Sequence, residues 1–159
     1  MLKAFKYRIS LTKGQQRVLD QQLETCRWVY NQTLAMRKQA WHERQESLRL
    51  YDTIKLLPVW KAARPDLKRV HSQVLQNIHV RVDLAFKAFF RRLKAGEDPG
   101  YPRFKQFGRY DSMTYPQYGN GVRLHGSTLI VRTHRECSKT TVWRKALRMR
   151  RGINLYSSR

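Results

Sequence analysis

The stretch Pro99-Gly100-Tyr101-Pro102-Arg103-Phe104-Lys105 divides the sequence into a helical part before it and a strand-rich part after it. Each proline fixes its own φ angle and restricts the residue before it, so we expect a stiff loop here rather than a helix. The loop gathers two rings and two cations, which suits stacking on bases and neutralising phosphates. The alternative is a proline-rich connector whose rings pack on the core.

Before this loop, the sequence predicts a long helix that begins after Thr12 and runs to about Ser47. Thr12 and Gln15 have the spacing of a capping box, in which each side chain bonds the backbone of the other residue. The apolar residues of this helix recur every three or four positions and predict a face packed on the core. They are Leu19, Leu23, Cys26, Tyr30 and Leu34.

A second long helix is predicted over residues 71–94, with Gly96 as its C-terminal cap. Its core-facing stripe is expected to be Val74, Ile78, Val82, Ala85, Phe89 and Leu93. Between the two helices, Pro58 and Pro65 break the chain. We expect a short helix over about 52–57 and then a turn, with Trp60 packed beneath it.

Strands are predicted at both ends of the helical part. Residues 2–9 alternate between apolar and basic side chains, which predicts a strand with one buried and one basic face. Short strands are expected at 112–115, 122–124 and 128–131, with a hairpin turn over 125–127. A lone strand is not stable, so 2–9 must pair with later strands. The predicted fold is therefore α+β, a small sheet interrupted by a helical insertion over 12–96.

The charge balance points to a polyanionic partner. The 159 residues carry 33 basic and 11 acidic side chains, a net charge of +22, which favours nucleic acid over a membrane surface. The two cysteines are far apart, too few for a disulfide framework or a zinc site. No signal-peptide or membrane-spanning run occurs in the sequence. We expect a protein of a reducing cytoplasm.

Read in order, these segments resemble the N-terminal part of TnpB (OrfB-type) insertion-sequence proteins, over about residues 1–129. The resemblance is carried by residues 3–9, 26–31, 85–105 and 110–117. It implies a wedge-type β-barrel with strands near 2–9 and 112–131, interrupted by a helical recognition lobe over about 12–96. The start of that lobe is helix-turn-helix-like in the family. The family's members are RNA-guided DNA nucleases, so guide-type RNA and DNA are the implied partners. The resemblance also implies a prokaryotic cytoplasm, with association with the nucleoid.

The candidate nucleic-acid contacts are cations, amides that read base edges, and rings that stack. They are Lys6, Arg8, Arg27, Arg91, Arg92, Arg103, Lys105 and Arg109, then Gln73, Gln76 and Gln117, then Tyr51, Tyr101 and Tyr115. Arg91 and Arg92 have a second interpretation, because cations at a helix C-terminus also complement its dipole. Gln73 and Gln76 also have a second interpretation, as ordinary helix surface.

The sequence departs from the family after about residue 130. Family members continue into a nuclease domain that binds a divalent metal such as Mg²⁺, and usually into a zinc element. With 11 acidic residues in all, we expect no catalytic residue, metal or other cofactor, and no nuclease activity, in this chain.

The segment 132–159 has nine basic residues and one acidic residue, without a clear strand or helix pattern. One permitted choice of codons for residues 132–137, when the reading frame is shifted by one base, encodes a strand typical of the family. We therefore hypothesise a truncated protein with a frameshifted tail, and an arginine-rich binding arm is the alternative. Two other functions stay open, a stand-alone helix-turn-helix-like DNA-binding regulator and a structure-binding RNA protein.

Overall fold

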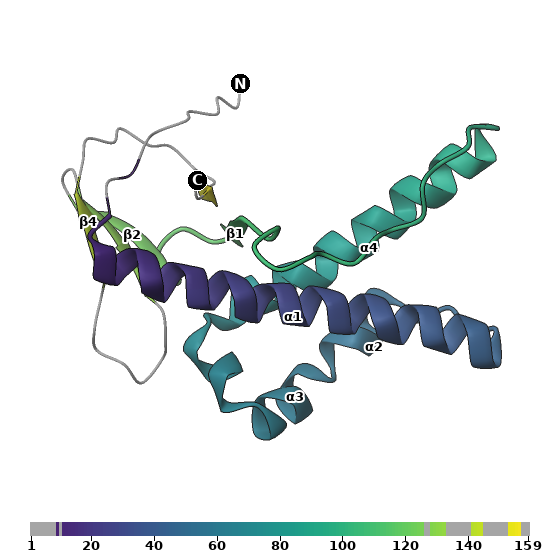
Figure 1. Cartoon of the computed structure of the whole chain (residues 1–159), viewed down its shortest axis with the longest axis horizontal. Coiled ribbons are helices and arrows are strands. Elements are labelled where there is room, and N and C mark those ends of the chain that lie inside the picture. Colours follow the sequence, from purple (N-terminus) through teal and green to yellow (C-terminus); the bar gives the residue numbers. More distant parts are fainter. Residues whose placement is uncertain (1–8, 10, 126–127, 133–140, 145–152, 157–159) are drawn as a thin grey trace.

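The computed structural model describes residues 9, 11–125, 128–132, 141–144 and 153–156. Helices come first along the chain and strands last, so the predicted α+β class is confirmed (Figure 1). The helices are α1 (Lys13–Arg44), α2 (Leu50–Ile54), α3 (Leu57–Ala63), the 3-10 helix η1 (Pro65–Arg69) and α4 (Ser72–Lys94). The strands are β1 (Ser112–Tyr115), β2 (Val122–His125), β3 (Thr128–Val131), β4 (Thr141–Arg144) and β5 (Ile153–Tyr156).

Helix α1 begins at the predicted capping box. The Thr12 side chain accepts from the backbone N–H of Gln15 (3.3 Å), and the Gln15 side chain accepts from the N–H of Thr12 (3.0 Å). All five residues of the predicted apolar stripe are buried, so that prediction is confirmed. The helix ends at Arg44, where Gln45 takes a left-handed conformation with φ 53°, slightly before the predicted end near Ser47.

Helix α4 confirms its predicted span and Gly96 cap (φ 76°), but only the first half of its stripe. Val74, Ile78 and Val82 are buried against α1, whereas Leu93 is 54% exposed. The reason is visible in Figure 1, where the far half of α4 leaves α1 and only the segment after α4 runs back along it. The prediction that Leu93 faces the core is therefore wrong.

The segment between the long helices covers one side of them. It forms α2, α3 and η1, more helix than the single short one predicted over 52–57. Trp60 is partly buried against the core, as predicted. Its ring stacks on His79 of α4 (centroids 5.6 Å apart) and meets Trp28 of α1 edge-on (5.6 Å), so it joins α3 to both long helices.

The described strands form two small antiparallel sheets, and these do not close into a barrel. β1 pairs with β5 in one sheet, and the other has the order β2-β3-β4. In the β2–β3 hairpin, His125 belongs to β2 and lies opposite Thr128, so β2 is one residue longer than predicted and His125 is not part of the turn. The turn residues 126–127, and residues 2–8 of the predicted first strand, lie outside the described residues. Met113 and Tyr115 face the core, whereas Ser112 and Thr114 are only partly buried.

The segment 132–159 contributes two strands, β4 and β5, where the sequence pattern indicated none. β4 extends the hairpin, and β5 pairs with β1 from Ser112 opposite Tyr156 to Tyr115 opposite Ile153. In the described part of the chain, no helix is both long and apolar enough to cross a membrane.

Candidate nucleic-acid interface

Side chains of α1 hold the backbone at the end of the Pro99–Lys105 loop and just after it. The Asn31 amide nitrogen donates to the carbonyl of Lys105 (2.9 Å), and the N–H of Lys105 donates to Asn31 Oδ1 (2.8 Å). Arg27 Nη1 also donates to the Lys105 carbonyl (3.2 Å). Three residues further on, the N–H of Gly108 donates to Glu24 Oε1 (3.0 Å). We call Glu24, Arg27 and Asn31 the α1 clasp.

Tyr101 packs on the two long helices. Its ring meets Phe86 and Phe89 of α4 edge-on, with centroids 5.6 and 5.2 Å away. From α1, Lys38 Nζ lies 4.8 Å from the ring centroid of Tyr101 and 4.8 Å from that of Phe104. Tyr101 is 40% exposed. The ring therefore anchors the loop, and only part of its surface is open to a base.

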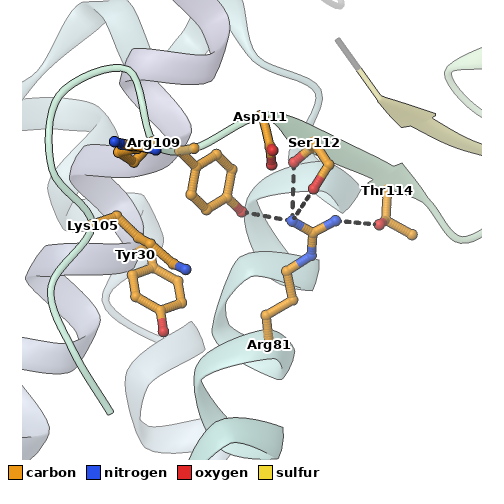
Figure 2. Close-up of a pocket in the computed structure, with 8 residues that line it drawn as sticks. Tyr30, Arg81, Lys105, Arg109, Asp111, Ser112 and Thr114 are labelled. Carbon is orange, nitrogen blue, oxygen red and sulfur yellow. Dashed lines mark hydrogen bonds between the residues drawn. The ribbon is translucent and has the colours of Figure 1, made fainter. Parts of the chain in front are cut away.

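A pocket of about 430 Å³ lies between α1, α4 and the chain that leads into β1 (Figure 2). It is lined by Tyr30, Arg81, Lys105, Arg109, Tyr110, Asp111, Ser112 and Thr114. In Figure 2 the Lys105 side chain lies above the Tyr30 ring, and its Nζ is 5.9 Å from that ring centroid. The lining is polar and has three cations against one carboxylate, which suits an anionic group.

Arg81 of α4 anchors the start of β1 beside this pocket. Its Nη1 donates toward the Tyr110 hydroxyl (3.1 Å) and toward the Ser112 carbonyl (2.9 Å) and hydroxyl (3.1 Å). Its Nη2 donates to Thr114 Oγ1 (2.6 Å). Because these donors already have acceptors, we assign Arg81 a positioning role. Lys105 and Arg109 are then the cations that a ligand can reach.

The buried titratable groups near the pocket are structural. Burial raises the pKa of the Tyr110 hydroxyl, and nearby Arg81 only partly opposes that rise. Burial also raises the pKa of Cys26 to about 12, which confirms its prediction as a small buried hydrophobe. Within the described residues, no group of three or more His, Cys, Asp or Glu side chains could hold a metal ion. What the site offers is rigid, positively charged surface.

Two known proteins or domains are similar to this chain. Residues 1–46 match the helix-turn-helix domain of IS605-type OrfB proteins. Over 125 residues the chain is 31% identical to InsQ of Escherichia coli (strain K12), which is described as a candidate RNA-guided DNA endonuclease. Both matches support a fragment of a TnpB (OrfB-type) protein. The aligned region covers 77% of this chain but 29% of InsQ, so the chain spans less than a third of that relative's length.

The helix-turn-helix match falls on one long helix. In the described part of the matched region, residues 9 and 11–46, α1 runs unbroken from Lys13 to Arg44. A helix-turn-helix needs a second helix across a short turn. The described residues of the match do not contain one.

The structure exposes most of the cations predicted as nucleic-acid contacts. Arg103, Lys105 and Arg109 are exposed along the loop and the segment after it. Arg91 and Arg92 are exposed at the end of α4, where Arg92 lies 3.7 Å from Glu97. Arg27 differs, because it is partly buried and occupied in the α1 clasp. Lys6 and Arg8 lie outside the described residues.

The predicted amides and rings do not gather on one surface. Gln73 donates to Gln117 (2.6 Å), which joins α4 to the connection after β1, and Gln76 is exposed on α4. Tyr51 is 73% exposed on α2. Tyr115 is 2% exposed, with its ring 5.9 Å from that of His71, because alternate residues of β1 face the core. Its ring is thus inaccessible to a nucleic acid in this structure.

Four residues of this site were missed from the sequence. Glu24 and Asn31 hold the segment after the loop, Arg81 anchors β1, and Phe107 is 79% exposed next to the α1 clasp. Asn31 lies next to Tyr30, a core residue, which is a weak signal for a role at the edge of the core. The partners of Asn31 and Arg81 lie 74 and 31 residues away, so no local pattern reveals them.

Proposed function

We propose that this chain is the nucleic-acid-binding part of a TnpB-type system, and that it holds a guide-type RNA together with DNA. The observation that carries the proposal is the basic segment 103–109, which the α1 clasp fixes in place with Arg103, Lys105 and Arg109 exposed. A net charge of +22 supports a polyanionic partner. The match to InsQ supports RNA and DNA in particular.

The proposal assigns binding, and not cleavage, to these 159 residues. Phosphodiester cleavage by two metal ions needs several convergent carboxylates. The chain has 11 acidic residues, and several of them already pair with cations. These are Glu24 with Arg27, Glu46 with Arg44, Asp66 with Arg64, Asp83 with Arg37 and Lys87, and Glu97 with Arg92.

A stand-alone DNA-binding regulator is the second candidate, favoured by the helix-turn-helix match over residues 1–46. Such a protein places a recognition helix in the major groove of a duplex. The unbroken course of α1 argues against that geometry in the described residues of the match. We therefore rank the regulator below the RNA-dependent function.

The test is to purify the full chain from its host and to sequence the nucleic acid that co-purifies. A discrete RNA is expected. Operator-like duplex DNA alone would replace the proposal with the regulator, and bulk ribosomal RNA would replace it with a structure-binding RNA protein.

Two variants that remove equal charge serve as controls. The loop variant carries Arg103→Ala, Lys105→Ala and Arg109→Ala and should lose the discrete RNA. The charge-matched variant carries Lys55→Ala, Lys68→Ala and Arg69→Ala, three exposed cations after α2 and in η1, and should retain it. Equal loss from both variants would show that overall charge alone accounts for the binding.

A further inference from the structure

We propose that Phe107 is a stacking platform for one unpaired base of a single-stranded nucleic acid, an inference that rests on the proposed function. The ring of Phe107 is 79% exposed. Singly exposed apolar side chains are common on protein surfaces, so exposure by itself assigns no role. The inference comes from how the ring is held and from what surrounds it.

The backbone on both sides of Phe107 is fixed to α1. Two residues before it, Lys105 is bonded through both its N–H and its carbonyl to Asn31. One residue after it, the N–H of Gly108 donates to Glu24. The N–H of Arg109 closes the turn on the carbonyl of Gln106 (3.0 Å), and Gly108 takes a positive φ of 67° that a side chain would disfavour. The exposed ring therefore sits on a constrained turn.

A fixed cation flanks the ring. The Arg27 guanidinium carbon lies 5.8 Å from the ring centroid of Phe107, within the range of a cation–π contact. Arg27 is itself oriented by an ion pair with Glu24 (2.6 Å) and by its bond to the Lys105 carbonyl (3.2 Å). The Phe107 ring and the Arg27 guanidinium are thus both positioned before any ligand binds. Positioned partners lose less conformational entropy on binding.

The neighbours of Phe107 favour a base over an apolar protein surface. Arg103, Lys105 and Arg109 lie on the same short segment, and all three are exposed. The buried centre of a protein–protein interface is usually depleted of charge, whereas single-strand binding sites combine a ring with cations for the flanking phosphates. Tyr101 is a less suitable platform, because its ring packs on Phe86 and Phe89. Phe104 is less exposed than Phe107, at 50% against 79%.

The experiment compares two strands of equal length, about 12 nucleotides, one of thymidines and one abasic. Phe107→Ala should weaken binding of the thymidine strand by about 5- to 150-fold, the range that loss of one base stack gives. Binding of the abasic strand, the salt dependence and the melting temperature should not change. Phe107→Trp should keep the affinity, whereas Phe107→Leu, which keeps apolar area but no ring, should lose most of it.

Trp41→Ala is the matched control, because Trp41 is a 54% exposed ring in the last turn of α1, away from the clasp. It should leave both strands bound as before. Repeating the assay with uridine strands tells whether the platform takes RNA, DNA or both. Unchanged affinity in Phe107→Ala, or an equal loss for the abasic strand, would overturn the platform alone. If the wild-type chain bound neither strand nor any co-purifying nucleic acid, the proposed function would fall as well.

Discussion

The side chain of Asn31 holds both backbone polar groups of Lys105, which lies 74 residues further along the chain. We expect Asn31→Ala to expose the N–H of Lys105 to solvent and to destabilise the fold by about 1–2 kcal/mol. Amide hydrogen exchange at Lys105 measures the first effect and urea unfolding the second. Asn31→Asp is the control, because it keeps the acceptor for the Lys105 N–H. If exchange at Lys105 stayed slow in Asn31→Ala, the clasp would not fix this segment.

Arg81 joins α4 to the start of β1 through Tyr110, Ser112 and Thr114. Arg81→Lys keeps the charge but loses the planar fork that reaches these acceptors together. We expect it to lower the free energy of unfolding by about 2–3 kcal/mol in urea titration. Arg91→Lys, at the exposed end of α4, should change it by less than about 0.5 kcal/mol. Equal unfolding midpoints for the two variants would contradict this role of Arg81.

Gly121 needs both its backbone conformation and its lack of a side chain. Its φ is 92°, and a Cβ there would lie 2.9 Å from atoms of the His71 ring. Gly119 has a similar φ of 89° but open space around it. Gly121→Ala should therefore be more destabilising than Gly119→Ala by about 1–2 kcal/mol, since only the first adds a clash to the strain. Thermal melting of the two variants checks this, and equal melting temperatures would mean that His71 moves aside freely.

The helical part could be predicted well because its signals are local. A capping box at Thr12 and an apolar stripe along α1 are contained in neighbouring residues. The same periodicity in α4 gave the helix correctly and the burial of Leu93 incorrectly. Periodicity tells which face of a helix is apolar, but not where the partner helix ends.

The candidate site was harder to predict, because its geometry depends on distant pairs. Composition revealed the cations, and the prolines indicated a stiff loop. The contacts of Asn31 with Lys105 and of Arg81 with Ser112 join elements that have no shared pattern. In the same way, the pairing of β5 with β1 depends on tertiary contact. The sequence of β5 is short and has no clear alternation, so this pairing could not be predicted from it.

His79 should make the fold sensitive to acid. Thr33 Oγ1 donates its hydrogen to the Val29 carbonyl (2.8 Å), so it accepts from His79 Nδ1 (3.3 Å) and leaves Nε2 as a buried acceptor without a partner in the described structure. Burial lowers the pKa of His79 from 6.5 to about 4. As the pH falls from 6.5 towards 4, the unfolded chain binds a proton that the folded chain does not.

The free energy of unfolding should therefore decrease over this window, by about 3 kcal/mol from this group. His79→Phe keeps a ring against Trp60 and removes the titration, so its stability should depend less on pH than that of the wild type. Urea unfolding at several pH values between 4 and 7 measures the difference. Parallel curves for the two proteins would show that His79 does not cause the acid sensitivity.

The exposed cations of the loop should set the salt dependence of binding. Each phosphate contact that releases a counterion adds about 0.7 (single strand) to 0.9 (duplex) to the slope of log affinity against log salt. If Arg103, Lys105 and Arg109 all contact phosphates, the loop variant should have a slope smaller by about 2–3. The charge-matched variant also loses three positive charges, but from the region after α2 and from η1. Its slope should therefore stay close to that of the wild type.

The two variants separate local contact from overall charge, because both lower the net charge equally. Arg103→Ala alone should reduce the slope by about one and weaken all sequences alike, since phosphates carry no sequence information. Tyr101→Ala should leave the slope unchanged. Because its ring contacts Phe86, Phe89 and Lys38, we expect its main effect to be a lower melting temperature. A loop variant with the wild-type slope would remove segment 103–109 from the binding surface, and the cations at the end of α4 would become the next residues to test.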